Sequence, residues 1–370
     1  MKTSVLKIVS LLLVMLMILS GCAPAVNGGD ETTEATTEAV TEEIVTSAPT
    51  TNAVTTEEPT TEAPTTELPT TEEITTDALT TEELTTSEIP QQPKDLKILM
   101  IGNSFCYYFV EELYALGKAD GYNLTVANLY KSGCSVYEHW QNGVTNKEKY
   151  YELYVTSGRG GRRAASYQAT IDYALEYSDW DVISLQQHFY PDMAMNYTFA
   201  IGQTQDYAKN VYDYVKEKNP TADLYWHQTW AYQVGYAVAS NHDTPIPDAL
   251  TQKLTHENIK AASEVIAEDN GVKLIPAGDA WQIAREDSRI GDVLCARASV
   301  NNGLGDYYHD GDIGGGQYLN ACVWYEVLTG KTCIGNTWRP NYELSEEKIV
   351  ALQEAAHAAV AAVYGEDYVK

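Results

Sequence analysis

The sequence predicts an α/β fold in which helices cover both faces of a doubly wound, five-stranded parallel sheet. Stretches with helical spacing separate the predicted strands, and this alternation is typical of a three-layer α/β domain. Five short apolar runs have the length and composition of buried parallel strands: 96–101, 124–129, 182–185, 224–226 and 272–275. Ligands of such sheets bind beyond the carboxyl ends of the strands, so we expect the functional residues in the turns that follow these runs.

The helices are predicted from apolar spacing and from their end signals. The last helix has the clearest ends, because Ser345 is suited to its N-cap and Gly365 to its C-cap. The other helical segments are expected after Ser104 at 110–116 and near 167–177, 204–218, 255–268 and 317–328.

The first 22 residues have the pattern of an export signal. Two lysines precede an apolar run at 8–19, which is short for a membrane span and ends in the letters LSGC at Cys22. This ending resembles the lipobox of bacterial lipoproteins, in which the cysteine becomes the lipidated first residue; a plain secretory signal is the alternative. We therefore expect residues 1–22 to be a lipoprotein signal peptide and Cys22 to be the membrane attachment. The protein would then lie on the outer surface of a bacterial cell.

Residues 23–93 form a low-complexity Thr/Glu/Pro-rich segment without aromatic or basic residues. Such a composition cannot bury a core, so we expect a disordered tether, with a glycosylated or binding stalk as the alternative. The folded part is expected at 94–370. Of the formal net charge of −28, the signal contributes +2 and the tether −16, which leaves −14 for this domain. An acidic domain argues against nucleic acid and against anionic membrane surfaces as partners.

The cysteines and acidic residues predict no metal site. Five cysteines remain besides Cys22, and no CxxC spacing occurs among them, so buried free thiols are expected. The run DGDIGGG after His309 begins like a calcium loop but has Ala321 where the twelfth-position glutamate belongs. We therefore predict that the protein needs no metal and no other cofactor.

Four segments carry residues suited to chemistry. They are IGNSF around Ser104, KSGCSVYEHW at 131–140, LQQHFY at 185–190 and DYYHDGDIGGG at 306–316. Taken alone, Ser104 is as well suited to be an N-cap as a nucleophile at the rim of the sheet.

Together, in this order and spacing, the four segments resemble the SGNH (GDSL-like) hydrolase superfamily, in particular a branch of exported bacterial proteins of uncharacterised function. The resemblance implies a flavodoxin-like sheet and a Ser-His-Asp triad. Ser104 would be the nucleophile, His309 the base that takes its proton, and Asp306 the residue that orients His309.

The resemblance also implies an oxyanion hole. Its donors would be the backbone N–H of Ser104, the glycine of the second segment, Gly133, and a side-chain amide after the third strand. Superfamily members usually have asparagine at the last position, whereas this chain offers Gln186 and Gln187, of which we favour Gln186. Asn103 replaces the usual aspartate, whose role is to brace the turn.

Further residues are candidates for substrate contact because they follow predicted strands or lie near the second segment. These are His139, His188, His227 and Trp230. The basic stretch Ser157 to Arg163 is either a site for an acidic group or a solvated loop.

We therefore predict a surface-tethered serine esterase that removes a short acyl group, most simply acetyl, from a carbohydrate, and that acts as a monomer. The alternatives are a non-catalytic glycan- or wall-binding module on the same fold and a structural surface protein in which the stalk matters most.

Overall fold

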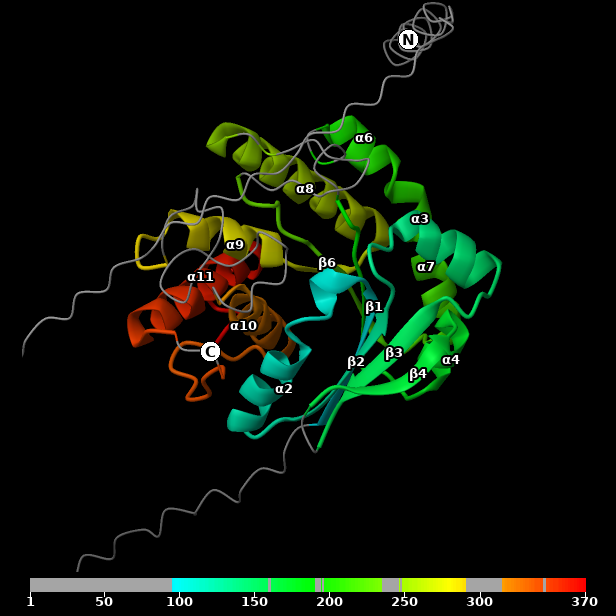
Figure 1. Cartoon of the computed structure of the whole chain (residues 1–370), viewed down its shortest axis with the longest axis horizontal. Coiled ribbons are helices and arrows are strands. Elements are labelled where there is room, and N and C mark those ends of the chain that lie inside the picture. The colour runs from blue at the N-terminus through cyan, green and yellow to red at the C-terminus, as the bar shows by residue number, and fades with distance from the viewer. Residues whose placement is uncertain are drawn as a thin grey trace, which may run out of the picture. The chain divides into compact units, whose positions relative to one another are not determined.

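The computed structural model describes residues 95–158, 161–189, 194, 196–234, 246, 248–290, 315–341 and 344–370. Its centre is a seven-stranded sheet with helices on both sides (Figure 1). The strand order is β4-β3-β2-β1-β5-β6-β7. The strands are β1 (Asp95–Gly102), β2 (Asn123–Tyr130), β3 (Tyr151–Thr156), β4 (Arg163–Ala169), β5 (Val182–Leu185), β6 (Asp223–His227) and β7 (Lys273–Ile275).

Five of these strands are parallel, and they are the five that the apolar runs predict. In spatial order they run β2-β1-β5-β6-β7, which is the doubly wound order of flavodoxin-like sheets. The chain order reverses at β1, so β1, β2 and β5 flank the point where such folds bind ligands. The predicted fold class is confirmed.

The antiparallel strands β3 and β4 were not predicted. They form a hairpin that extends the sheet beyond β2. The prediction of a helix near 167–177 is wrong at its start, because residues up to Ala169 belong to β4. The helix α4 (Ile171–Glu176) begins only after Thr170, whose side chain accepts a hydrogen bond from the backbone N–H of Tyr173.

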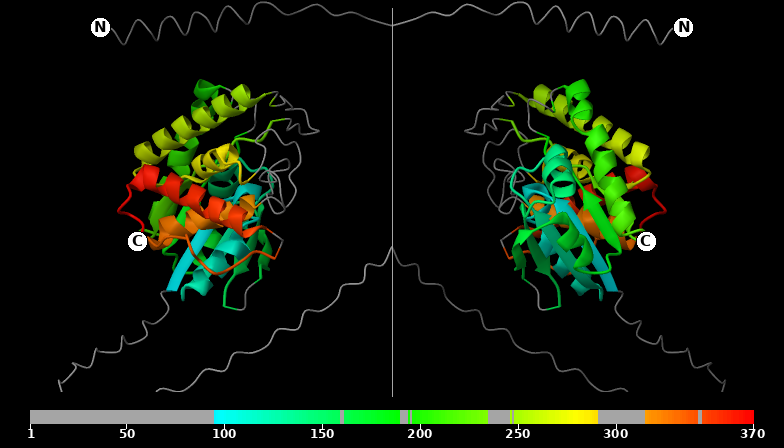
Figure 2. Two further views of the ribbon diagram at one scale, coloured as in Figure 1. Left: turned by 90° about the vertical axis from the view of Figure 1, so that its left-hand side faces the viewer. Right: turned by 90° about the vertical axis from the view of Figure 1, so that its right-hand side faces the viewer.

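Two hydrophobic clusters form the core, one on each face of the sheet. Alternate residues of β1 supply both, because Ile98 and Met100 point to one face and Leu99 and Ile101 to the other. The first cluster packs α2 (Val110–Ala119), α9 (Ala277–Glu286), α10 (Gly316–Thr329) and α11 (Glu346–Tyr364). Figure 2 shows α10 and α11, in orange and red, lying side by side.

The second cluster packs the remaining helices against the opposite face. They are α3 (Val136–Glu138), the π-helix η2 (His139–Thr145), α4, α7 (Gln205–Lys218) and α8 (Ala249–Asn270), with α6 (Tyr197–Gly202) packed on α7 and α8. Both ends of α11 are as predicted, since Ser345 caps its first turn and Gly365 follows its last residue. The helix predicted at 255–268 begins earlier, because Asp248 provides an N-cap before Ala249.

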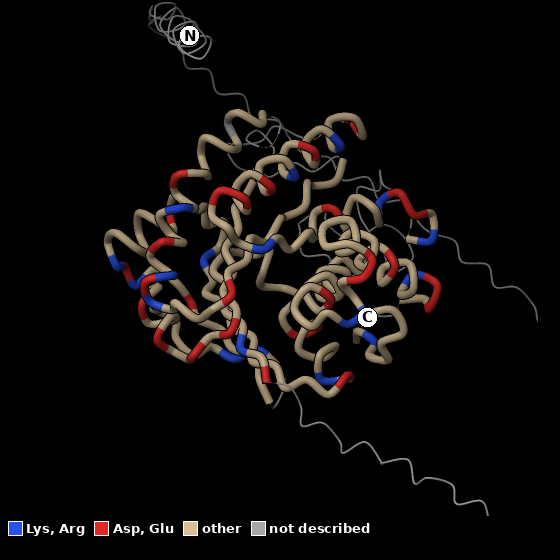
Figure 3. The backbone as a smooth tube through the Cα atoms, turned by 180° about the vertical axis from the view of Figure 1, so that it is seen from behind, with Lys and Arg blue, Asp and Glu red and all other residues tan. Residues whose placement is uncertain are grey.

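The surface charges are mixed. Figure 3 shows Lys and Arg positions interspersed with Asp and Glu positions, and over the described residues seen there no continuous basic face forms. Among the described helices, none has both the length and the apolar character needed to cross a membrane.

Candidate active site

The turn after β1 holds Ser104 at the carboxyl edge of the sheet. Gly102 ends the strand, and a short 3₁₀ helix, η1 (Ser104–Cys106), begins two residues later. The N-cap of η1 is Asn103, whose Oδ1 accepts a hydrogen bond from the N–H of Phe105 at 3.0 Å. Ser104 therefore does not have the capping role that its local sequence left open.

Gly102 is required by close packing. A Cβ built on it would lie 2.7 Å from Sγ of Cys106 and 2.9 Å from the side chain of Gln186. The absence of a side chain thus lets Gln186 lie directly against the turn that carries Ser104.

Asn103 joins three strand ends. Its Nδ2 donates to the carbonyl of Cys134, at 2.9 Å, in the turn after β2. Its Oδ1 accepts from Nε2 of Gln186, directly after β5, as well as from Phe105. The side chain therefore braces the turn, as the resemblance implies for this position, and it fixes the ends of β1, β2 and β5 relative to one another.

The turn after β2 presents Gly133 beside this junction. Gly133 has a φ of 62°, a left-handed conformation that favours glycine. Ser135 then caps α3 in a capping box with Glu138, whose carboxylate accepts from the N–H of Ser135 at 2.8 Å. Before Gly133, the N–H of Lys131 donates to the carbonyl of Gly102 at 3.1 Å, so the backbone is held on both sides of the glycine.

The two glutamines point to opposite faces of the sheet, as consecutive residues at a strand end do. Gln187 is engaged on the α3 and α7 side, where its Oε1 accepts from the N–H of Val136 at 3.0 Å and its Nε2 donates to Oγ1 of Thr204 at 2.9 Å. Gln186 lies on the Asn103 side. Of the two amides, that of Gln186 is the one placed against the Ser104 turn.

His227 fixes the orientation of the Gln186 amide. Nε2 of Gln186 donates to Asn103, so Oε1 is the atom that faces Nδ1 of His227, at 3.1 Å. Because that oxygen can only accept, Nδ1 of His227 carries the proton. Burial lowers the pKa of His227 to about 3, so the imidazole is neutral.

The other two histidine candidates are also buried and neutral. Burial lowers the pKa values of His139 and His188 to about 4. His188 lies at the junction, with Nδ1 3.4 Å from the carbonyl of Gly133 and Nε2 3.0 Å from the hydroxyl of Tyr232. His139 is fully buried behind the turn after β2, with Nδ1 3.6 Å from Sγ of Cys134 and its ring stacked on Tyr151.

Trp230 supports the site from the interior. Its ring stacks on Trp281 with centroids 4.3 Å apart and meets Phe105, the neighbour of Ser104, edge-on at 4.5 Å. Only 2% of Trp230 is exposed, so it packs behind the turn.

The basic stretch 157–163 lies between β3 and β4 in the chain, with Arg163 as the first residue of β4, and its described residue Arg162 makes contacts outside the hairpin. The N–H of Arg162 donates to Oε1 of Glu111 at 2.6 Å, and Nη1 donates to the carbonyl of Tyr107 at 2.6 Å. The guanidinium also lies 3.6 Å from the ring centroid of Tyr107. The sequence did not predict this attachment of the hairpin to the segment that follows Ser104.

Several predictions lie outside the described residues. These are the signal peptide with Cys22, the tether at 23–93, the Asp306 and His309 pair, and the glycine-rich run at 310–314. Within the described ranges no group of three or more His, Cys, Asp or Glu side chains is arranged to hold a metal ion. Four described cysteines are free and buried: Cys106, Cys134, Cys322 and Cys333.

The fold and this junction define a class of protein: a doubly wound α/β protein with a polar site at the carboxyl ends of its central strands. More particularly, the chain belongs to the DUF4886 family, described as a domain of unknown function, whose model matches residues 97–359. No protein with a curated description matches the chain.

Several solved structures are similar to the chain. A DUF4886 family protein from Bacteroides uniformis is 29% identical, with a TM-score of 0.58, covering 74% of this chain and 96% of that one. A Parabacteroides merdae protein described as a GDSL-like lipase is 16% identical, with a TM-score of 0.38, covering 63% and 95%. A Clostridium thermocellum family 3 carbohydrate esterase is 14% identical, with a TM-score of 0.34, covering 63% and 94%.

Proposed function

We propose that the protein is an exported serine esterase with Ser104 as its nucleophile. The observation that carries this proposal is the junction around Asn103, which ties the Ser104 turn to the ends of β2 and β5. Such bracing is what a nucleophile needs, because catalytic groups act only when held in a fixed geometry. A serine that served only to start a helix would not need these links.

The proposed reaction follows from the triad that the sequence motifs imply. Oγ of Ser104 attacks the ester carbonyl while His309 takes its proton, and Asp306 keeps the imidazole in the correct tautomer. The tetrahedral intermediate collapses, the C–O bond of the ester breaks, and the alcohol leaves with the proton from His309. Water, deprotonated by His309, then attacks the acyl-enzyme and releases the acid.

The negative charge on the tetrahedral intermediate needs hydrogen-bond donors. We assign them to the N–H of Ser104, the N–H of Gly133 and the side-chain amide of Gln186. The position of Gln186 against Gly102 and Asn103 supports this choice over Gln187, whose amide donates to Thr204 on the other face. One hydrogen of the Gln186 amide is bound to Asn103, and the second is available to substrate.

We propose a short acyl ester on a carbohydrate as the substrate. The reason is that the protein is expected to lie outside the cell. Lipidation at Cys22 would be its only membrane attachment, and the acidic domain disfavours nucleic acid as a partner. The catalysis proposed here uses no metal or other cofactor, and one copy of the chain contains every group it needs.

Turnover of p-nitrophenyl acetate tests the proposal. The variant Ser104→Ala should lose turnover and its labelling by a fluorophosphonate probe. Ser178→Ala is the matched control, because Ser178 precedes β5 at the opposite edge of the sheet. Unchanged turnover in Ser104→Ala would refute the mechanism. A wild-type chain that resists the probe yet binds glycans would instead be a non-catalytic binding module.

A further inference from the structure

A cavity of about 690 Å³ lies along the outer side of α2. It is bounded by three further parts of the chain: the start of α10, the segment 335–341 and the β3–β4 loop at Gly161. Its lining residues from α2 span Glu111 to Ala119, a helical rise of about 12 Å. The volume lies within the usual range for small-molecule sites.

Three polar groups in this groove have no hydrogen-bond partner among the described residues. They are the hydroxyl of Tyr114, the side-chain amide of Gln317 and the indole N–H of Trp338. Tyr114 is only 6% exposed and Gln317 only 7%, yet their polar ends stay accessible to solvent from the groove. Groups that only water contacts in the free protein can hydrogen-bond a ligand that enters the groove.

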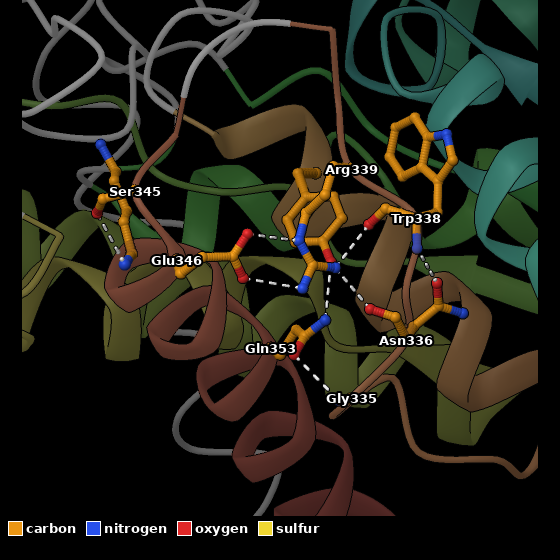
Figure 4. A network of polar contacts seen from close by, with 9 residues as sticks. Gly335, Asn336, Trp338, Arg339, Ser345, Glu346 and Gln353 are labelled. Carbon is orange, nitrogen blue, oxygen red and sulfur yellow. Dashed lines mark hydrogen bonds and ion pairs between the residues drawn. The ribbon is translucent and has the colours of Figure 1, made fainter. Parts of the chain in front are cut away.

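Trp338 is held rigidly as one wall of the groove. Figure 4 shows the network beside it: Arg339 pairs in bidentate fashion with Glu346, at 3.0 and 2.9 Å. Nη1 of Arg339 also donates to the carbonyls of Asn336 and Trp338, at 2.6 and 2.9 Å. The indole stands clear of this network (Figure 4) and contacts the ring of Tyr318, with centroids 5.9 Å apart.

The charges of the groove disfavour an anionic ligand. Glu111 and Glu112 line one end and Lys118 the other, so the described part of the lining has more negative than positive charge. The acidic tether of this chain is therefore a poor occupant. Uncharged donors and acceptors beside a fixed aromatic ring suit a polyhydroxylated, uncharged ligand, whose C–H faces pack on the ring while its hydroxyls bond the amide and the phenol.

We propose that the groove between α2, α10 and the segment 335–341 binds a neutral oligosaccharide segment. Glycan binding in the groove does not depend on the proposed function. Only the expectation that this glycan carries the ester to be cleaved rests on that function. The first residues of the groove follow Ser104 closely in sequence, since Glu111 is in the first turn of α2. A polymer bound along α2 would thus be guided toward the Ser104 turn.

Affinity electrophoresis of the full chain tests the proposal, with soluble xylan, glucomannan or polygalacturonate in the gel. The Ser104→Ala background keeps the polymers unaltered during the run. We expect retardation by a neutral polymer and none by polygalacturonate. Trp338→Ala should weaken binding about tenfold or more through loss of stacking area. Ala115→Trp, which fills the groove from a half-buried position on α2, should do the same.

Tyr167→Ala is the matched control, because Tyr167 is 71% exposed on β4 and does not line the groove. It should leave binding unchanged. The proposal is overturned if no neutral polymer retards the chain, or if retardation is unchanged in both Trp338→Ala and Ala115→Trp. Glycan binding that depends on Trp338 in a chain without esterase activity would refute the proposed function and leave the groove assignment standing. Esterase activity without glycan binding would refute the groove assignment and leave the proposed function standing.

Discussion

Gln186 donates its side-chain amide to Oδ1 of Asn103, so the residue after β5 is bonded directly to the turn after β1. Its other amide atom, Oε1, accepts from His227, the last residue of β6. This chain of hydrogen bonds runs across the carboxyl ends of three strands that are neighbours in the sheet but far apart in sequence. It gives the Gln186 amide a single orientation at the Ser104 turn.

The two glutamines should therefore differ in their effect on catalysis, although each variant loses buried hydrogen bonds. Gln186→Leu should lower kcat for p-nitrophenyl acetate by about 10²–10³ with little change in KM, as expected for removal of an oxyanion donor. Gln187→Leu should leave kcat nearly intact. It should instead lower the free energy of unfolding by about 2 kcal/mol, because the buried N–H groups of Val136 and His188 lose their acceptor. Steady-state kinetics and urea unfolding of both variants check this, and the opposite pattern would assign the donor to Gln187.

Gly102→Ala should damage the site through packing alone. The added Cβ would meet Cys106 and Gln186 closer than real contacts allow, so we expect a loss of about 1–3 kcal/mol in unfolding free energy. Activity should fall as well, because Gln186 must move. Gly202→Ala is the control, since nothing lies within 4 Å of its added Cβ. An active and fully stable Gly102→Ala variant would contradict the close packing of Gln186 on the turn.

The parallel part of the sheet could be predicted because each strand is a continuous apolar run, buried on both faces. The hairpin β3–β4 could not. All residues of its second strand except Ala169 are exposed or half-exposed, and Tyr167 points into solvent, so the strand contains no apolar run. Its pairing with β2 is a long-range contact that leaves no local period in the sequence.

The site was predictable where backbone constraints fix residue type. Gly102, Asn103 and Gly133 each have a geometric reason to be there. The residues that surround the site were not predictable, because an aromatic or histidine side chain at a strand end fits a cleft wall and a core equally well. Trp230 and His139 are both buried, and only tertiary packing distinguishes these two environments.

Acid should destabilise the protein through its buried histidines. The folded-state pKa values of about 4 for His139 and His188 and about 3 for His227 lie below the value of about 6.5 for an unfolded histidine. The unfolded chain therefore binds more protons below pH 6.5, and stability falls as the pH falls toward 4. Each histidine should account for about 2 kcal/mol between pH 7 and pH 5.

Urea unfolding at several pH values measures this dependence. His227→Gln should be less stable than the wild type at pH 7 but should show a shallower decline toward pH 5, because one titrating group is gone. A decline in His227→Gln as steep as that of the wild type would mean that His227 is protonated in the folded state.

Arg339→Lys should weaken glycan binding far more than it weakens the fold. The Arg339–Glu346 pair is about one-third exposed on the arginine side, and such pairs contribute at most about 1 kcal/mol. A lysine cannot form the planar fork that binds the Glu346 carboxylate while also holding the carbonyls of Asn336 and Trp338. The Trp338 indole would then lose its fixed position in the groove.

We therefore expect the midpoint of urea unfolding to move little, while retardation by a neutral polysaccharide falls severalfold. Lys209→Ala is the control, because it removes an exposed ion pair with Asp213 on α7, on the other face of the sheet. It should change neither quantity. Unaltered glycan affinity in Arg339→Lys would show that Trp338 keeps its position without the arginine, and the bracing role would then belong to the contact between Trp338 and Tyr318.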